Sequence, residues 1–215
     1  MKIGRYEVAC NTFYGELADG QIYPLQGELH NLTRKPNALP VDIRLARTLA
    51  PVLPTKILAL GPGHNNMMPP GREPPARPFL FFKPSSCVNN PEDPILYPTG
   101  VTNILYELEI ALVIGKTASR VPQDKALDYV LGYTCCNDVT AGSLKEDWGT
   151  QLSYHWKAFD SFGPLGPVIA TDLGNIEGLS MVSRINGKVH ADTKVSLIYS
   201  PADIVSWVSH IMTLN

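Results

Sequence analysis

The sequence predicts an α+β fold dominated by β-strands, and three observations lead to this prediction. The 215 residues include 19 prolines and 17 glycines, which divide the chain into short elements. Most apolar stretches between them alternate with polar positions or are only about four to eight residues long, as strands are. Helical spacing is confined to a few segments. Together these features favour a mixed β-roll with few short helices over a helical bundle.

The first 50 residues predict a small β-meander. Three stretches have the composition or alternation of strands, and Ala18-Asp19-Gly20 is a turn signal between the last two. These strands are expected at residues 2–10, 14–17 and 21–25. The spacing in residues 41–49 predicts a short helix.

Prolines gather near residues 51–54 and indicate a soft domain boundary. We therefore expect a small N-terminal β unit, residues 1–50, followed by a larger catalytic domain, residues 51–215. Expected strands in the larger domain are residues 56–60, 79–84, 93–98, 106–114, 130–136, 168–170, 179–185 and 188–191. Expected helices are residues 122–130 and 201–212, with a short helix within 139–162 and a proline-rich loop at 69–78.

Composition excludes several classes of function. The formal net charge of −2 leaves no basic footprint for nucleic acid or an anionic membrane. No apolar run is long enough to span a bilayer, and the charged start is unlike a secretory signal. The four cysteines form no C-x-x-C pair, so we expect reduced thiols. These features predict a cytoplasmic protein with neither a nucleic-acid nor a membrane partner.

The clearest chemical signal is Glu107-Leu108-Glu109 within the predicted strand 106–114. In a strand, residues i and i+2 share a face and lie about 6.5 Å apart. Two buried carboxylates side by side repel unless a cation neutralises them, and a hard divalent ion prefers such oxygen ligands. The alternative is a solvated strand face, on which both glutamates contact only water.

Asp138 and Lys157 are two further candidates. Asp138 follows the apolar strand 130–136 where the chain becomes polar, which is a common place for a metal ligand or a catalytic acid. It could instead form an Asx-turn or cap a helix. Lys157 is framed by Trp156 and Phe159 and is followed by two Gly-Pro turns, which suggests a held cation. The alternative is a surface lysine whose stem packs on apolar neighbours.

Taken in order, these motifs resemble the fumarylacetoacetate hydrolase family. The matching segments are Leu80-Phe81-Phe82-Lys83-Pro84, Tyr106-Glu107-Leu108-Glu109, Gly132-Tyr133-Thr134 with Asn137-Asp138, and Lys157-Ala158-Phe159-Asp160 with the following Gly-Pro turns. The resemblance implies a β-rich roll that is usually dimeric, so a homodimer is expected. It also implies that Glu107, Glu109 and Asp138 bind Mg²⁺ or Mn²⁺. The metal would chelate a small oxo-acid substrate, and Lys157 would stabilise the developing enolate or oxyanion.

The sequence departs from the family's hydrolytic members in two places. Alignment on their Gly-x-Asn-Tyr motif puts His64 at the tyrosine and Met67 at the water-activating histidine. His64 or Glu73 is then the candidate acid/base, and Lys83 a candidate substrate contact. In the family, the ending Met212-Thr213-Leu214-Asn215 continues into a further strand, so we expect a domain truncated at its C-terminal end.

These departures shift the expected reaction. We expect isomerisation or decarboxylation of a 2-oxo or 2-hydroxydienoic acid in the breakdown of aromatic compounds, because neither reaction needs an attacking water. Two alternatives stay open: a C–C bond hydrolase of the acylpyruvate type, and a non-catalytic paralogue that keeps the metal site.

Overall fold

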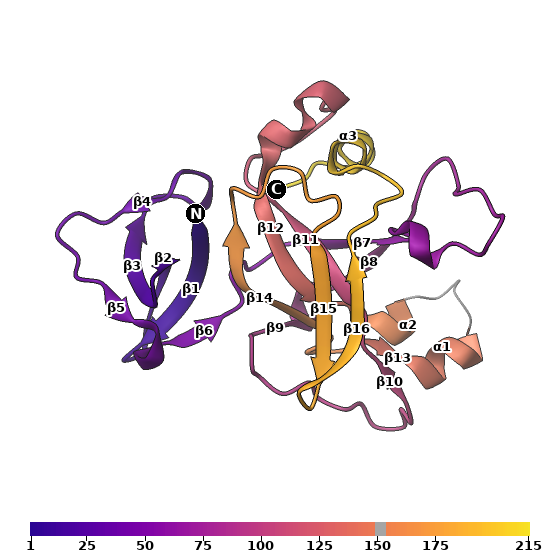
Figure 1. Cartoon of the computed structure of the whole chain (residues 1–215), viewed down its shortest axis with the longest axis horizontal. Coiled ribbons are helices and arrows are strands. Elements are labelled where there is room, and N and C mark those ends of the chain that lie inside the picture. Colours follow the sequence, from indigo (N-terminus) through magenta and orange to yellow (C-terminus); the bar gives the residue numbers. More distant parts are fainter. Residues whose placement is uncertain (149–153) are drawn as a thin grey trace.

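Strands from the N-terminal fifth of the chain and strands from the remainder form one continuous ten-stranded sheet. A computed structural model describes residues 1–148 and 154–215 (Figure 1). The central path of the sheet runs β11-β12-β14-β1-β2-β3-β4, with β5, β6 and β9 joining at its sides. The β-dominated α+β fold predicted from the sequence is confirmed.

The N-terminal strands are β1 (Lys2–Val8), β2 (Asn11–Ala18), β3 (Gln21–Gln26), β4 (Thr33–Arg34), β5 (Val41–Asp42) and β6 (Arg47–Leu49). The predicted meander is present, and Asp19 and Gly20 take the left-handed conformation that a two-residue hairpin needs. The helix predicted at residues 41–49 is wrong. That stretch contains two short strands around a single 3-10 turn, Ile43–Leu45.

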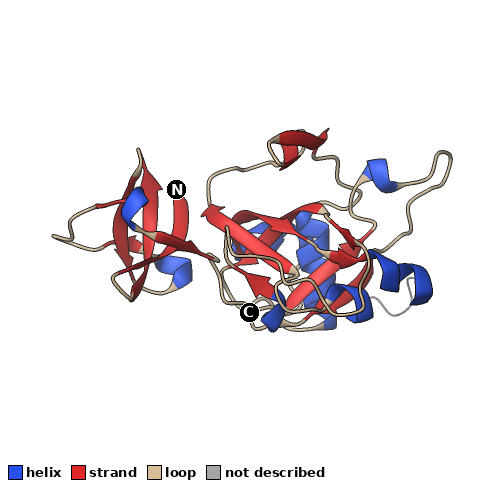
Figure 2. Ribbon diagram, turned by 90° about the horizontal axis from the view of Figure 1, so that it is seen from below, coloured by secondary structure: helices blue, strands red, loops and turns tan. Residues whose placement is uncertain are grey.

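One edge of β1 joins the two parts of the chain. Its residues Lys2 and Ile3 pair with Ala170 and Ile169 of β14, while its later residues pair with β6. The amino group of Met1 also forms an ion pair with Asp172 at 2.9 Å. Figures 1 and 2 both show β1–β6 at one end of the long axis of the molecule. The boundary predicted near residue 50 stays a prediction, since the sheet runs across it.

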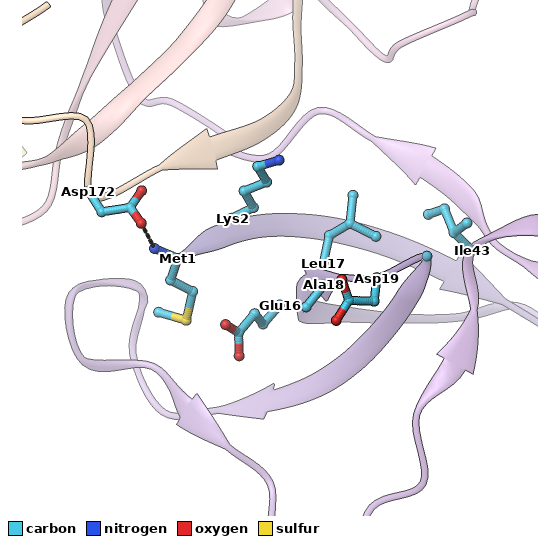
Figure 3. Close-up of a pocket in the computed structure, with 9 residues that line it drawn as sticks. Met1, Lys2, Glu16, Leu17, Ala18, Asp19, Ile43 and Asp172 are labelled. Carbon is cyan, nitrogen blue, oxygen red and sulfur yellow. Dashed lines mark ion pairs between the residues drawn. The ribbon is translucent and has the colours of Figure 1, made fainter.

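A hollow of about 480 Å³ lies beside this junction (Figure 3). It is lined by Met1, Lys2, Glu16, Leu17, Ala18, Asp19, Gly20, Ile43 and Asp172. None of the residues that the sequence singles out for chemistry is among them. The hollow is therefore a feature of the junction, and the candidate chemistry lies elsewhere.

The strands of the larger domain are β7 (Ile57–Gly61), β8 (Phe79–Lys83), β9 (Val88–Asn89), β10 (Ile104–Leu105), β11 (Leu108–Ile114), β12 (Val130–Asn137), β13 (Thr140–Ala141), β14 (Gly163–Ala170), β15 (Ser180–Ile185) and β16 (Lys188–Lys194). Its α-helices are α1 (Gly142–Trp148), α2 (Tyr154–Lys157) and α3 (Pro201–Ile211), and its 3-10 helices include Gln123–Tyr129. The strand predicted at residues 93–98 is wrong, because that stretch is an irregular loop.

Two apolar clusters support the site described below. Helix α3, capped by Ser200 and Asp203 in a capping box, packs Val205 and Val208 against the turn at residues 118–126. A second cluster buries Val139, Ala141, Trp156 of α2 and Phe162, with Leu144 of α1 packed against it. Trp156, the residue before Lys157, is thus fixed by packing. In the described residues, no helix is long and apolar enough to cross a membrane.

Candidate active site

Three carboxylates come together where β11 begins and β12 ends. Glu109 lies in β11, Glu107 immediately precedes that strand, and Asp138 immediately follows β12. The pairing of Leu108 with Asn137 brings the two strand ends together. The sequence placed Glu107 inside the strand, whereas its N–H donates to the Asn137 side chain at 3.1 Å. Its carbonyl accepts the N–H of Asp138 at 3.0 Å, which locks the two ends.

Two buried lysines hold the carboxylates. Lys157, at the end of α2, has its Nζ 2.5 Å from Glu107 Oε2 and 2.5 Å from Asp138 Oδ2. Lys83, the last residue of β8, has its Nζ 2.6 Å from Asp138 Oδ1 and 3.0 Å from the Phe162 carbonyl. Only 3% of Lys83 and 4% of Lys157 are exposed. These are buried, hydrogen-bonded ion pairs, so the reading of Lys157 as a surface lysine does not hold.

The surroundings of Lys157 explain why its ammonium stays in place. The rings of Phe81 and Trp156 lie 5.5 and 5.6 Å from its Nζ, a distance at which aromatic faces attract a cation. Phe159, which the sequence placed beside Lys157, packs instead against Phe162. The ammonium is therefore enclosed by two carboxylates and two rings.

Thr140 is a site residue that the sequence analysis missed. Its hydroxyl donates to Glu107 Oε1 at 2.9 Å, and the residue is fully buried. A hydroxyl two residues after Asp138 has no distinguishing pattern, because a threonine in a short strand is usually there for packing. Only the fold shows that Thr140 orients the Glu107 carboxylate.

Glu109 is the carboxylate whose negative charge is least balanced by hydrogen-bonded positive groups. Burial, together with the negative charges of Asp138 and Glu107, raises its pKa to about 7, against an opposing effect of Lys157. Neither ammonium bonds to it in the described structure. Its neighbour is His64, whose Nε2 lies 3.7 Å from Glu109 Oε2. Glu109 is the place in the cluster where additional positive charge would be most stabilising.

His64 follows β7 and is mostly buried, with 12% of its side chain exposed. Burial lowers its pKa, while the carboxylate of Glu177 opposes that shift. A neutral imidazole beside a carboxyl group can accept or donate a proton near neutral pH. Glu73, the other acid/base candidate, is exposed in the loop before β8. The structure thus brings His64 to the cluster and leaves Glu73 at the surface.

The donor chemistry of the cluster fits a hard divalent ion. Four oxygens of Glu107 and Asp138 each accept one hydrogen bond, from Lys83, Lys157 or Thr140. Each carboxylate oxygen keeps a second lone pair, and Glu109 adds a further carboxylate. Within residues 1–148 and 154–215, no three His, Cys, Asp or Glu side chains already converge as a ready metal cage. Glu107 and Asp138 are instead hydrogen-bonded to Lys157.

Comparison with known proteins agrees with this geometry. Residues 58–215 match the family model described as the C-terminal part of fumarylacetoacetate (FAA) hydrolase. An uncharacterized protein of Archaeoglobus fulgidus is 37% identical over 201 residues, 93% of this chain and 79% of that protein. A 2,4-didehydro-3-deoxy-L-rhamnonate hydrolase of a Sphingomonas species is 32% identical, over 92% of this chain and 74% of the enzyme.

The fold is also similar to solved structures. The 2-hydroxyhepta-2,4-diene-1,7-dioate isomerase of Mycobacterium marinum superposes with a TM-score of 0.88 and 27% identity, covering all of this chain and 83% of the isomerase. Relatives of this chain are thus enzymes of more than one reaction type. The shared sequence, fold and order of site motifs lead to one conclusion: the chain belongs to the fumarylacetoacetate hydrolase family.

Proposed function

We propose that this chain is a divalent-metal-dependent enzyme that isomerises or decarboxylates a small 2-oxo or 2-hydroxydienoic acid. The observation that carries the proposal is the convergence of Glu107 and Asp138 on the buried ammonium of Lys157, with Glu109 close enough for both carboxylates to raise its pKa. Such a cluster combines hard oxygen ligands with a fixed positive charge. Both are suited to a substrate that gathers negative charge on an oxygen during the reaction.

Glu107, Glu109 and Asp138 would hold Mg²⁺ or Mn²⁺, and the bound ion would supply Lewis-acid polarisation of the substrate oxygens. Lys157 supplies a second source of positive charge. An ammonium has three N–H donors, and Glu107 and Asp138 account for two of them among the described contacts. The third can donate to an enolate oxygen as charge develops there. Phe81 and Trp156 keep the ammonium oriented while it does so.

His64 is proposed to transfer the proton. Isomerisation of a 2-hydroxydienoic acid to the 2-oxo form removes the proton of the enol hydroxyl and adds a proton to a carbon of the conjugated chain, which needs one positioned acid–base group and no attacking water. His64 lies next to Glu109, and burial favours its neutral form. It can therefore accept the proton and return it.

Lys83 stays a predicted substrate contact, although its hydrogen bonds favour a role in orienting Asp138. Its Nζ is buried and bonded to Asp138 and to the Phe162 carbonyl. We propose that it mainly fixes Asp138 in the orientation that a metal ligand needs. A substrate oxygen could use only the one donor that remains.

Hydrolysis of a carbon–carbon bond is the second candidate. The observation in its favour is the 32% identity to a hydrolase of a Sphingomonas species. Hydrolysis needs a group that positions water, and His64, whose Nε2 lies 3.7 Å from Glu109 Oε2, is a candidate for that part. The products distinguish the candidates, because hydrolysis releases two organic fragments, decarboxylation releases CO₂ and one organic product, and isomerisation gives one product of unchanged mass.

The test is a metal-dependent absorbance assay with oxaloacetate, an acylpyruvate and a 2-hydroxydienedioate, each with Mg²⁺, with Mn²⁺ and with EDTA. We expect metal-dependent loss of one acid, no turnover in EDTA, and a product that identifies the reaction. Asp138→Asn should weaken Mn²⁺ binding in calorimetry by more than the roughly tenfold that loss of an outer-shell partner costs, while far-UV circular dichroism stays unchanged. Metal binding without turnover of any of the three acids would favour the non-catalytic paralogue.

The proposal also includes a homodimer in the cytoplasm. The dimer is part of what the family resemblance implies, and light scattering of the purified chain measures it directly. A mass near the 23.6 kDa of one chain would remove the dimer from the proposal.

A further inference from the structure

The segment that carries His64 is hydrogen-bonded to the connection between β16 and α3. The chain leaves β7 at Gly61 and returns to β8 at Phe79, and residues 62–78 between them form an insertion that extends from the ribbon (Figure 1). His64 and Leu197 form an isolated antiparallel bridge. The N–H of Asn65 donates to the Ser196 carbonyl at 2.9 Å, and the N–H of Ile198 donates to the Gly63 carbonyl at 3.0 Å.

The side chain of Asn65 reinforces this bridge. Its amide nitrogen donates to Ser196 Oγ at 3.1 Å and to the Leu197 carbonyl at 3.1 Å. The two N–H donors of one amide thus bind Leu197, which is paired with His64, and the preceding Ser196. Since the neighbouring backbone N–H bonds the same segment, Asn65 is attached through both main chain and side chain.

These contacts set the place of the imidazole. The bridge holds His64 in an extended conformation, with φ −117° and ψ 143°. In that conformation its Nε2 lies 3.7 Å from Glu109 Oε2. A residue carried on a long insertion has many accessible positions unless its backbone is fixed, and proton transfer needs placement within a fraction of an ångström. Precise placement of the imidazole therefore requires that the backbone be held by contacts close to His64.

We propose that Asn65 is the positioning residue for His64, acting through its amide contacts to Ser196 and Leu197. This inference rests on the acid–base part of the proposed function. Asn65 acts through His64 and does not itself contact the carboxylate cluster in the described structure. The amide keeps the bridge closed, and the closed bridge holds the imidazole against Glu109.

The same insertion offers a matched comparison. At its far end, the Tyr199 hydroxyl donates to the Pro75 carbonyl at 2.6 Å. Tyr199→Phe removes this hydrogen bond, which is distant from His64, and leaves the bridge at His64 intact. If the position of His64 depends on Asn65, the two variants should differ although each removes a contact between the same two segments.

The experiment has a structural and a kinetic readout. The first is the His64 ring proton resonance in NMR spectra of wild type, Asn65→Ala, Asn65→Asp and Tyr199→Phe, with His64→Ala used for assignment. We expect the resonance to shift or broaden in both Asn65 variants and to stay unchanged in Tyr199→Phe. Asn65→Asp keeps the size of the side chain and loses both donors, so it reports on the contact even if Asn65→Ala folds poorly. An unchanged resonance in Asn65→Asp would overturn the proposal.

The second readout is a double-mutant cycle with whichever of oxaloacetate, the acylpyruvate or the 2-hydroxydienedioate is turned over. Asn65→Ala should lower kcat about tenfold with KM unchanged, as expected when a group acting in the transition state is displaced. In the His64→Ala background the same change should have no further effect. Equal losses in both backgrounds would show a general structural role and overturn the inference.

The acid–base role of His64 and the positioning role of Asn65 can be refuted separately. If His64→Ala retains wild-type kcat, the acid–base role in the proposed function fails, and the NMR comparison alone decides whether Asn65 positions the ring. If His64→Ala loses activity and Asn65→Ala does not, the proposed function stands and the positioning role is refuted.

Discussion

Replacing Lys83 by methionine tests whether the buried ion pair with Asp138 stabilises the metal-free protein. The change keeps the apolar stem and removes the ammonium, which bonds to Asp138 at 2.6 Å and to the Phe162 carbonyl at 3.0 Å. Breaking a buried pair by removing one partner costs about 3–5 kcal/mol. Asp138 keeps its bond to Lys157, so we expect the lower end of that range, about 3 kcal/mol.

The effect is large enough to measure by two methods. For a chain of this length, about 1 kcal/mol shifts Tm by roughly 2–4 °C, so Lys83→Met should lower Tm by about 6–12 °C. Urea unfolding in EDTA should show a lower midpoint with an unchanged m value. EDTA is required because a bound ion would itself compensate Asp138.

Lys56→Met is the matched control. Lys56 also donates to a carbonyl, that of Thr213 at 2.7 Å, but this contact is exposed to solvent. We expect its removal to cost less than about 1 kcal/mol. A Lys83→Met protein as stable as Lys56→Met would refute the reasoning, because it would show that the buried ammonium contributes no more than a surface one.

Three further predictions concern other parts of the chain. The pKa of Glu109 rises from 4.5 in the unfolded chain to about 7 in the folded one, so the folded state binds more protons between these pH values. The free energy of unfolding of the metal-free protein should therefore fall by up to about 3 kcal/mol as pH rises from about 4.5 to 7. Glu109→Gln should flatten this slope in urea titrations, and an equally steep slope in the variant would contradict the assignment. Ser200→Ala removes the side-chain cap of α3 and should cost about 1 kcal/mol by thermal unfolding, with Ser200→Thr, which keeps the hydroxyl, close to wild type. Gly132→Ala should destabilise the protein by about 1–3 kcal/mol, because the added Cβ would clash with the Ala170 carbonyl oxygen. Gly61→Ala is the control, since an added Cβ at Gly61 would meet no atom within 4 Å.

The local part of the site could be predicted from the sequence. Local pattern alone placed Glu109 within an apolar strand and Asp138 just beyond the end of the next strand, and both are found there. The contact of Lys83 with Asp138 could not be predicted in this way, since it joins residues 55 positions apart. Such pairs depend on how the β7–β8 ribbon docks, which no local pattern encodes. The family match confirms the resemblance on which the remaining site assignments rest.

The two wrong elements have a common physical cause. In the loop at residues 93–98, Asn89 donates to the carbonyls of Asp93 and Pro94, and the Asp93 carboxylate accepts from Arg47. Near residue 42, the Asp42 carboxylate accepts the N–H and the side chain of Arg44. Short polar side chains that bond the nearby backbone compete with regular strands and helices. Apolar spacing alone does not reveal this competition.

The shared edge of β1 has a consequence for how the chain is made. Val8 and its neighbours find their β2 and β6 partners within the first 50 residues, so that part of the meander can form soon after it leaves the ribosome. Lys2 and Ile3 must wait for Ala170 and Ile169. At about 5–20 residues per second, that delay is roughly 10–30 s. During this interval the start of β1 is an open edge, and the nascent chain needs β14 to close it.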